Sequence, residues 1–294
     1  MFIDIHTHIF SKNICEHREK YFSEEPEFKL LYDSPKSKLV GASELIACMN
    51  EQGIDKSVVF GFPWNRFETA RLQNDYILEM VAAHPDRLIG FCCLNPLHPA
   101  AADEVDRCIQ AGLKGVGELA FYQSRIDEPV LDALSPIMFR CEEHRLPVLI
   151  HTNEPIGHAY PGKAPMTLAE IYRMVRRFPD NAIVLAHWGG GLPFYHLLKK
   201  EVKDALKNVY VDTAASPFLY DQSIYPVAAM AFGHDKILMG SDFPLLKPLR
   251  YMDDMKKAGL PDVQIHAICG ENAARLLWPE SASENSSEIT SGPR

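Results

Sequence analysis

The sequence has no excess of positive charge, no paired cysteine motif and no long apolar run. Its 30 Lys and Arg stand against 39 Asp and Glu, and the net charge of −9 argues against a nucleic-acid partner. Its seven cysteines form no CxxC pair and mostly lie in apolar runs, as free thiols do in a reducing compartment. There is no run of about 18 apolar residues, and MFIDIHTHIF at the start lacks a basic n-region and a cleavage site. We therefore expect a soluble, cytoplasmic protein with no membrane partner.

What the sequence does contain is a series of short, continuous apolar runs, which is typical of strands buried on both faces of a parallel sheet. The eight runs are FIDI (2–5), SVVF (57–60), LIGFCCL (88–94), KGVGEL (114–119), PVLI (147–150), AIVLA (182–186), VYVD (209–212) and KILMG (236–240). Segments with helical periodicity lie between them, so the pattern predicts an α/β protein. Eight βα units predict closure into a (β/α)8 TIM barrel, a single domain over residues 1–280. An open doubly wound sheet is the alternative, although no GxGxxG follows the first run.

Three helices are predicted in detail. The clearest begins with the capping box of Thr167 and Glu170 and ends before Pro179. A second is predicted from an apolar stripe after the glycine run 189–191, and a third over 101–109, ending at Gly112. The stripe consists of Leu192, Tyr195, Leu198 and Val202.

Three segments interrupt this pattern. Residues 10–40 are polar and predict a loop insertion that could cover the barrel mouth. Residues 153–165 are too rich in Gly and Pro for a helix. Residues 281–294 have the composition of a disordered C-terminal tail.

Six polar residues fall at the C-terminal ends of predicted strands, the face on which barrel enzymes build their active sites. They are His6, His8, Glu118, His151, His187 and Asp242. A lone histidine at a strand end is more often a hydrogen-bonded structural group, and a lone Asp in a turn is more often a helix cap. Together, however, so many buried polar groups need a compensating partner, and a divalent cation is the obvious one. The pattern therefore predicts a metal site.

Four motifs carry a family resemblance. DIHTH (4–8), LIH (149–151), AHWGG (186–190) and GSDFP (240–244) resemble the amidohydrolase superfamily. They are most similar to its branch that includes aminocarboxymuconate-semialdehyde decarboxylase and γ-resorcylate decarboxylase. The resemblance runs in order along residues 1 to about 278.

The resemblance implies roles for the six residues. His6, His8, His151 and Asp242 would hold the primary metal, and His187 would hold a second metal or act as an acid or base. Asp242 would also carry the proton, so the catalytic residues would be Asp242 and His187. Glu118 is placed where two-metal members have a bridging carboxylate, so one or two ions are expected. Such ligands suit Zn2+ first, and also Mn2+, Fe2+, Co2+ or Ni2+.

Two reactions fit these residues. The main prediction is hydrolysis of a small lactone, ester or amide by water that the metal activates, because the strand-end Glu118 favours it. The GSDFP and AHWGG motifs favour the alternative, non-oxidative decarboxylation of an unsaturated or aromatic carboxylic acid. A metal-dependent nuclease and a non-catalytic metal-binding protein are weaker alternatives, the first because of the acidic balance.

The partner expected is a small molecule that is anionic or contains a carbonyl group. Candidates for binding it lie just past the strands: His158, Tyr160, Lys163, Arg66 and Trp188, with Tyr122 and Arg250 as further choices. Individually each is more often a surface residue than a substrate contact. The sequence leaves a homodimer open.

Overall fold

Parallel strands form the centre of the protein in a computed structural model, which describes residues 1–279. The expected tail, 281–294, lies outside the described residues. The strands are β1 (Ile3–His8), β2 (Lys56–Phe60), β3 (Leu88–Gly90), β4 (Val116–Leu119), β5 (Val148–Ile150), β6 (Ile183–Leu185), β7 (Val209–Asp212) and β8 (Ile237–Leu238). They pair in the order β1-β2-β3 and β4-β5-β6-β7-β8, with every pair parallel.

Backbone hydrogen bonds close these two groups into one ring. Cys92 N donates to Gly115 O (2.9 Å), which joins the β3 side to β4. Ile5 N donates to Met239 O (2.9 Å), which joins β1 to the residues after β8. The ring of eight strands confirms the predicted (β/α)8 barrel, and it directs the C-terminal ends of all eight strands to one face.

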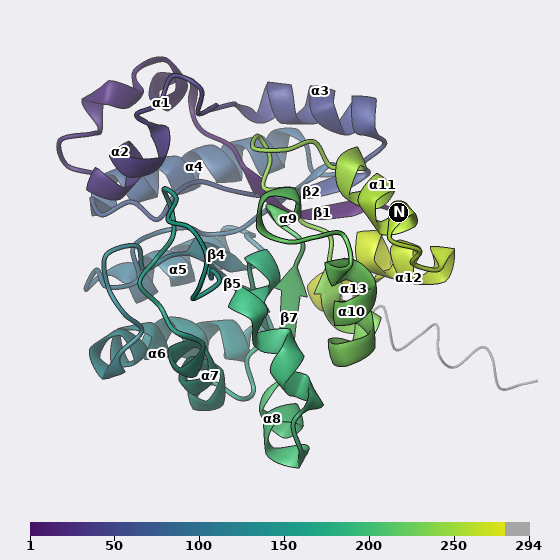
Figure 1. Cartoon of the computed structure of the whole chain (residues 1–294). Coiled ribbons are helices and arrows are strands. Elements are labelled where there is room, and N and C mark those ends of the chain that lie inside the picture. The colour runs from purple at the N-terminus through teal and green to yellow at the C-terminus, as the bar shows by residue number, and fades with distance from the viewer. Residues whose placement is uncertain (280–294) are drawn as a thin grey trace, which may run out of the picture.

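Helices surround the strands, with α3 and α4 in the upper part of Figure 1 and α5 to α7 in the lower left part. The regular α-helices are α1 (Lys12–Glu16), α2 (Pro26–Tyr32), α3 (Ala42–Gln52), α4 (Phe67–Ala83), α5 (Ala101–Gln110), α6 (Glu128–Glu143), α7 (Leu168–Arg177), α8 (Lys200–Ala205), α9 (Ser216–Leu219), α10 (Ile224–Ala228), α11 (Leu249–Lys257), α12 (Asp262–His266) and α13 (Asn272–Leu277). Irregular helical turns are η1 (Arg18–Lys20), η2 (His187–Leu197), η3 (Ala229–Gly233), η4 (His234–Lys236) and η5 (Ala267–Glu271). Among residues 1–279, no helix combines the length and the apolar character that crossing a membrane requires.

The interior of the barrel is filled by apolar side chains below the strand ends. Ile3 and Ile5 of β1 pack in one buried group with Val58, Phe60 and Leu149. Burying a side chain of this size contributes about 1.5–3 kcal/mol. The pairing of β1 with β2 shifts register between Asp4 and Thr7. Such an irregularity re-aims side chains, and it lets Ile5 fill the core while the next residues turn to the mouth.

Two of the predicted helices are confirmed. In α7, Thr167 Oγ1 accepts from Glu170 N (3.3 Å) and Thr167 N donates to Glu170 Oε2 (2.8 Å), which is the predicted capping box. The helix ends at Arg177, two residues before Pro179. Helix α5 ends at Gln110, just before Gly112 with φ +106°.

The segment 10–40 lies at the barrel mouth but is not a loop. It contains α1, η1 and α2, and its aromatic side chains anchor it. Pro26 is in the first turn of α2, where its fixed φ favours a helix. Phe28 packs 4.5 Å from Trp64 and 6.1 Å from Phe10, measured between ring centroids. Tertiary packing thus stabilises helices too short to be read from a polar sequence.

The prediction of a helix from the apolar stripe after residues 189–191 is wrong. Residues 188–191 all have positive φ, between 60° and 95°, which glycine tolerates and a right-handed helix does not. Leu198 is extended and 52% exposed, and α8 begins only at Lys200. The apolar spacing therefore does not mark one buried helix face, since Leu192 is buried but Tyr195 and Leu198 are exposed.

Candidate metal centre and active site

Two histidines of β1 bring their Nε2 atoms face to face. His6 Nε2 lies 3.3 Å from His8 Nε2, and both side chains are buried. The other ring nitrogens are engaged: His6 Nδ1 lies 2.8 Å from Asp212 Oδ2, and His8 Nδ1 lies 2.9 Å from the carbonyl oxygen of Gly61. Because a carboxylate and a carbonyl only accept, Nδ1 carries the proton of a neutral ring and Nε2 presents a lone pair. Two such lone pairs require positive charge between them.

Asp242, just beyond β8, completes a triangle with these two nitrogens. Its Oδ1 lies 3.5 Å from His6 Nε2 and 3.4 Å from His8 Nε2. Its backbone N–H donates to His6 O (3.0 Å), so the seam between β8 and β1 fixes the position of the aspartate. Asp242 has φ +58°, a conformation that Asp adopts more readily than most residues.

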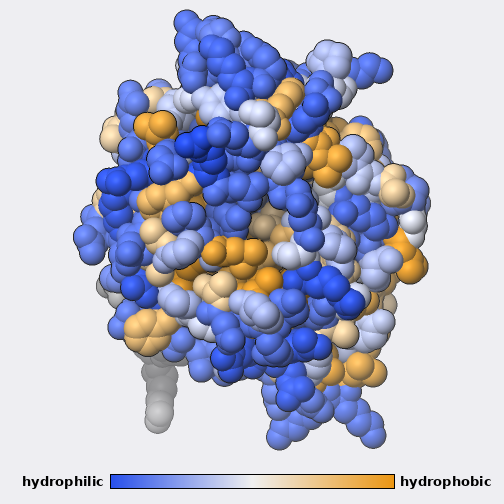
Figure 2. All heavy atoms as spheres, turned by 90° about the vertical axis from the view of Figure 1, so that its left-hand side faces the viewer, coloured by the Kyte–Doolittle hydropathy of each residue, from blue (hydrophilic) through white to orange (hydrophobic). Residues whose placement is uncertain are grey.

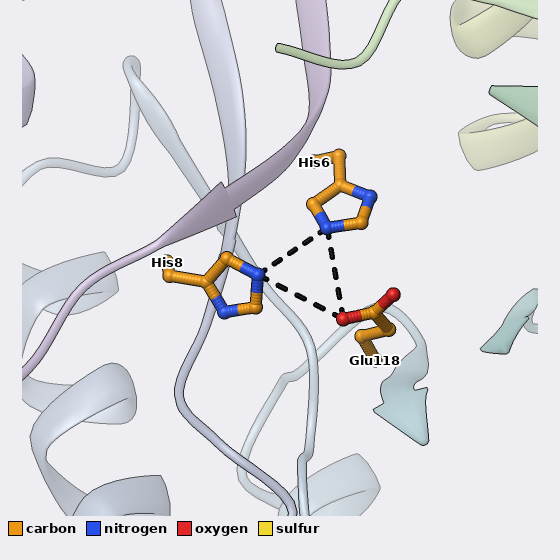
Figure 3. Close-up of side chains that lie close together, drawn as sticks. All are labelled: His6, His8 and Glu118. Carbon is orange, nitrogen blue, oxygen red and sulfur yellow. Dashed lines mark hydrogen bonds and ion pairs between the residues drawn. The ribbon is translucent and has the colours of Figure 1, made fainter. Parts of the chain in front are cut away.

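Glu118 of β4 adds a fourth donor. Its Oε2 lies 3.7 Å from His6 Nε2 and 3.8 Å from His8 Nε2, and Figure 3 shows the three groups converging. Five of the six separations among the donor atoms of His6, His8, Asp242 and Glu118 thus fall between 3.3 and 3.8 Å. Tetrahedral ligands about 2.1 Å from a divalent ion lie about 3.4 Å apart, so this donor set fits such an ion.

Two further histidines face the other oxygen of Glu118. Its Oε1 lies 3.0 Å from His151 Nδ1 and 3.5 Å from His187 Nε2. His151 Nε2 lies 2.9 Å from Gly162 O and His187 Nδ1 lies 3.2 Å from Ala214 O, so each ring is held by a backbone carbonyl. The structure therefore brings all six predicted residues together, with Glu118 between the β1 histidines and His151 and His187.

One buried carboxylate that the sequence analysis missed organises this cluster. Asp212, the last residue of β7, is 0% exposed. Besides binding His6 through Oδ2, it accepts through Oδ1 from the backbone N–H groups of His187 (2.8 Å) and Ala214 (3.0 Å). Asp212 thus sets the tautomer of His6 and fixes the backbone position of His187. The signal was present, because VYVD (209–212) ends in an acidic residue at the same face of the barrel.

A second missed carboxylate supports the turn that carries Asp242. Asp4 is fully buried and accepts from Ser241 N (2.9 Å) and Ser241 Oγ (2.5 Å). It also accepts from His6 N (3.2 Å). One side chain therefore links the β1 histidine to the turn after β8.

The electrostatics of the cluster favour a cation. Burial alone would lower the pKa of His6, but the charges of Glu118 and Asp212 raise it to about 10. Burial alone would raise the pKa of Glu118, but the charges of His6 and His151 hold it well below its ordinary value. The pKa of Asp242 is also lowered by neighbouring histidines, despite burial. The carboxylates thus stay ionised, and protons or a metal ion supply the balancing charge.

The cluster forms the floor of a cavity of about 530 Å³. Most of its wall is apolar and aromatic, with Leu31, Tyr32, Phe62, Tyr122, Phe218 and Leu245, and the polar residues Lys36, Ser37 and Lys38 also line it. Burial raises the pKa of Tyr32 and of Tyr122, and the charges of Asp242 and Glu118 raise both further, so both phenols stay protonated at neutral pH. Figure 2 shows the side on which α2 and α6 lie, where apolar side chains gather near the middle within a mainly polar surround.

Only some of the predicted substrate-binding residues line the cavity. His158, Tyr160 and Tyr122 line the cavity. Lys163 instead binds Glu154 Oε1 (2.9 Å) and backbone carbonyls of its own loop. The other three do not line the cavity. Trp188 is 1% exposed and donates to Ser216 Oγ (2.7 Å), Arg66 pairs with Glu24, and Arg250 pairs with Asp254.

The amidohydrolase family profile matches residues 3–277. The chain belongs to the amidohydrolase family. The resemblance in its four motifs is confirmed.

Two curated proteins are similar to this amidohydrolase over most of its length. It is 24% identical to 2-amino-3-carboxymuconate-6-semialdehyde decarboxylase of Dictyostelium discoideum, over 94% of this chain and 91% of that protein. It is 26% identical to γ-resorcylate decarboxylase of Polaromonas sp., over 71% of this chain and 76% of that protein.

Solved structures show the same fold. This amidohydrolase superimposes on 5-carboxyvanillate decarboxylase of Sphingomonas paucimobilis with a TM-score of 0.74 and 21% identity, over 94% and 98% of the two chains. It superimposes on dihydroxybenzoic acid decarboxylase of Polaromonas sp. with a TM-score of 0.68 and 20% identity, over 94% and 96%. The latter structure contains manganese and the inhibitor 2-nitroresorcinol.

Proposed function

We propose that the protein is a metal-dependent, non-oxidative decarboxylase of an unsaturated or aromatic carboxylic acid. The observation that carries the proposal is the placement of a cation-binding floor beneath an apolar, aromatic wall in one cavity. Such a cavity accepts a flat, unsaturated acid whose polar end reaches the floor. The two curated relatives, which are decarboxylases, support this choice over hydrolysis.

His6, His8 and Asp242 would hold the ion, with Glu118 as a fourth donor and His151 positioned by Glu118. When bound, the ion would hold the oxygens of the acid and draw electron density from the breaking bond. The sequence favoured zinc, but the manganese in the Polaromonas structure leads us to include Mn2+ equally.

The residues around the ion suit the loss of CO2. Once the acid fills the cavity, the apolar part of the wall would exclude water and thereby disfavour the charged carboxylate relative to uncharged CO2. When the carbon–carbon bond breaks, its electron pair stays on the substrate carbon and must receive a proton. His187 can deliver this proton, because Glu118 raises its pKa despite burial. Asp242 is ionised and can deliver a proton only after it has taken one up from water or from the bound acid.

Hydrolysis stays the second candidate because of one observation. Glu118 presents one oxygen to His6 and His8 and the other to His151 and His187, as a carboxylate that bridges two ions would. In that case Asp242 would take the proton of the attacking water.

The test is a panel of lactones, amides and unsaturated or aromatic carboxylic acids. Release of CO2 without 18O from labelled water in the product is the expected result. Incorporation of 18O without release of CO2 would favour hydrolysis over decarboxylation. Elemental analysis gives the number of metal ions per chain. One equivalent of metal that Glu118→Gln leaves unchanged supports a single ion. Two equivalents that fall to one in Glu118→Gln support a second ion bridged by Glu118. 2-Nitroresorcinol, a planar compound that carries a nitro group in place of a carboxylate, is a suitable binding probe.

A further inference from the structure

Two tyrosines in the cavity wall have hydroxyl groups without a partner among the described residues. Tyr32 comes from the end of α2, and Tyr122 follows β4, so they approach from different segments. Both line the cavity. Within residues 1–279 neither hydroxyl makes a hydrogen bond. By contrast, the Tyr160 hydroxyl donates to Glu154 Oε2 (2.9 Å), and the Tyr251 hydroxyl donates to Ser241 O (2.7 Å).

The rings of both tyrosines are fixed by packing. Tyr122 stacks on Phe62 with centroids 6.0 Å apart and an interplanar angle of 8°, and it lies 5.0 Å from the His151 ring. The Tyr32 ring packs against Phe28 (4.7 Å) and Phe10 (5.7 Å). Aromatic contacts of this kind hold the rings but offer the hydroxyl groups nothing.

A ligand that fills the cavity would remove water from both hydroxyls. A ligand without an acceptor would then leave two buried donors unsatisfied, which is costly, whereas a ligand with an anionic oxygen would gain two hydrogen bonds. Recognition of this kind discriminates strongly, because the wrong ligand leaves buried polar groups unpaired.

We propose that Tyr32 and Tyr122 donate hydrogen bonds to an oxygen substituent of the acid other than the carboxylate that is lost, and so select acids that carry one. The substituent would be a phenolate, a hydroxyl or a second carboxylate. The inference rests on the proposed function for the identity of the acid, but the binding it describes does not require turnover.

The test compares two probes on the metal-loaded protein: 2-nitroresorcinol, which carries two hydroxyls, and nitrobenzene, which carries none. The wild-type protein should bind 2-nitroresorcinol more tightly. Tyr32→Phe and Tyr122→Phe should each weaken its binding about 10-fold, the expected contribution of a hydrogen bond to a charged group. Binding of nitrobenzene should stay the same or improve.

Tyr172→Phe is the matched control. The Tyr172 hydroxyl also lacks a partner, but it lies on α7 beside a different groove. Melting temperature and metal content, measured for every variant, separate a binding effect from damage to the fold. Equal affinity of the wild-type protein for both probes, or unchanged 2-nitroresorcinol binding in the double variant, would overturn the inference.

The two proposals fail in different ways. If CO2 is released but the probes are bound equally, the tyrosine inference alone is wrong. If the tyrosines select the probe and no acid releases CO2, the proposed reaction alone is wrong.

Discussion

The floor and the rim of the cavity are built differently. Floor groups lie at strand ends, as His6 and Asp212 do, where both are fully buried and bound to each other at 2.8 Å. Rim groups lie in the segments 10–40 and 153–165, where Lys163 is held by Glu154 of its own loop. The hydrogen bonds of the barrel set the position of a strand-end residue, whereas a loop residue goes where its own partners hold it.

This difference has an energetic consequence. Removing one member of a buried, charged network leaves its partners uncompensated and is costly. Exposed ion pairs contribute little, typically 0–1 kcal/mol. Function should therefore depend more on the floor residues than on the rim residues.

The largest effect is expected when both β1 histidines are replaced. His6→Ala with His8→Ala removes the two facing Nε2 atoms, so the protein should lose its bound metal and all activity. Because the barrel core lies below this layer, circular dichroism should still show a folded protein. His144→Ala with His266→Ala, two exposed histidines, is the control. Full metal retention in the His6→Ala, His8→Ala variant would contradict the proposed metal site.

Asp242→Asn should have the next largest effect. The amide keeps an oxygen near His6 and His8 but can no longer carry the proton. Since positioned acids and bases contribute about 10²–10⁴-fold, kcat should fall by at least this range. Single-turnover CO2 release is the measurement, with exposed Asp253→Asn as the control. A kcat within threefold of the wild-type value would mean that Asp242 does not transfer the proton.

Asp212→Asn should weaken metal binding without abolishing it. Asn has one acceptor oxygen, but the native carboxylate accepts on one side from His6 and on the other from His187 N. One donor would therefore face the amide NH2, and the His6 ring would shift or change tautomer. Loss of such an outer partner typically costs 10–100-fold in metal affinity.

Competition with a chelator measures this change, and exposed Asp204→Asn is the control. Unaltered metal affinity together with a lowered melting temperature would make Asp212 a purely structural residue.

The same contrast explains what could be predicted from the sequence. The six floor residues were recognisable because eight strands of known direction meet at one face, so sequence position gives spatial position. The rings of His6 and His8 require acceptors for their second nitrogens, and applying that requirement to each strand end would have found Asp212.

The rim could not be predicted in this way. Trp188 is turned into the core because it lies in a run of positive φ, from His187 to Gly191, that spacing does not reveal. Arg66 pairs with Glu24, and Lys163 pairs with Glu154. The sequence shows both glutamates but does not indicate which cation each one pairs with. Tyr32 lies in a segment that we predicted to be a loop, where no periodicity pointed to it.

The smallest effect is expected at the rim, with Glu154→Gln. Glu154 binds Lys163 Nζ and the Tyr160 hydroxyl, both at 2.9 Å, and so holds the loop that presents Tyr160 and His158 to the cavity. Removing its charge should loosen the loop and raise KM roughly fivefold, since one partly exposed, charge-assisted bond contributes about 1 kcal/mol. The floor is untouched, so kcat should stay within twofold. Glu24→Gln, which removes the exposed Arg66 pair, should change neither constant. The alternative outcome is a fall in kcat comparable to that of Asp212→Asn. Because Gly162 O of this loop accepts from His151 Nε2, such a fall would mean that the loop positions a floor residue and that floor and rim are not independent.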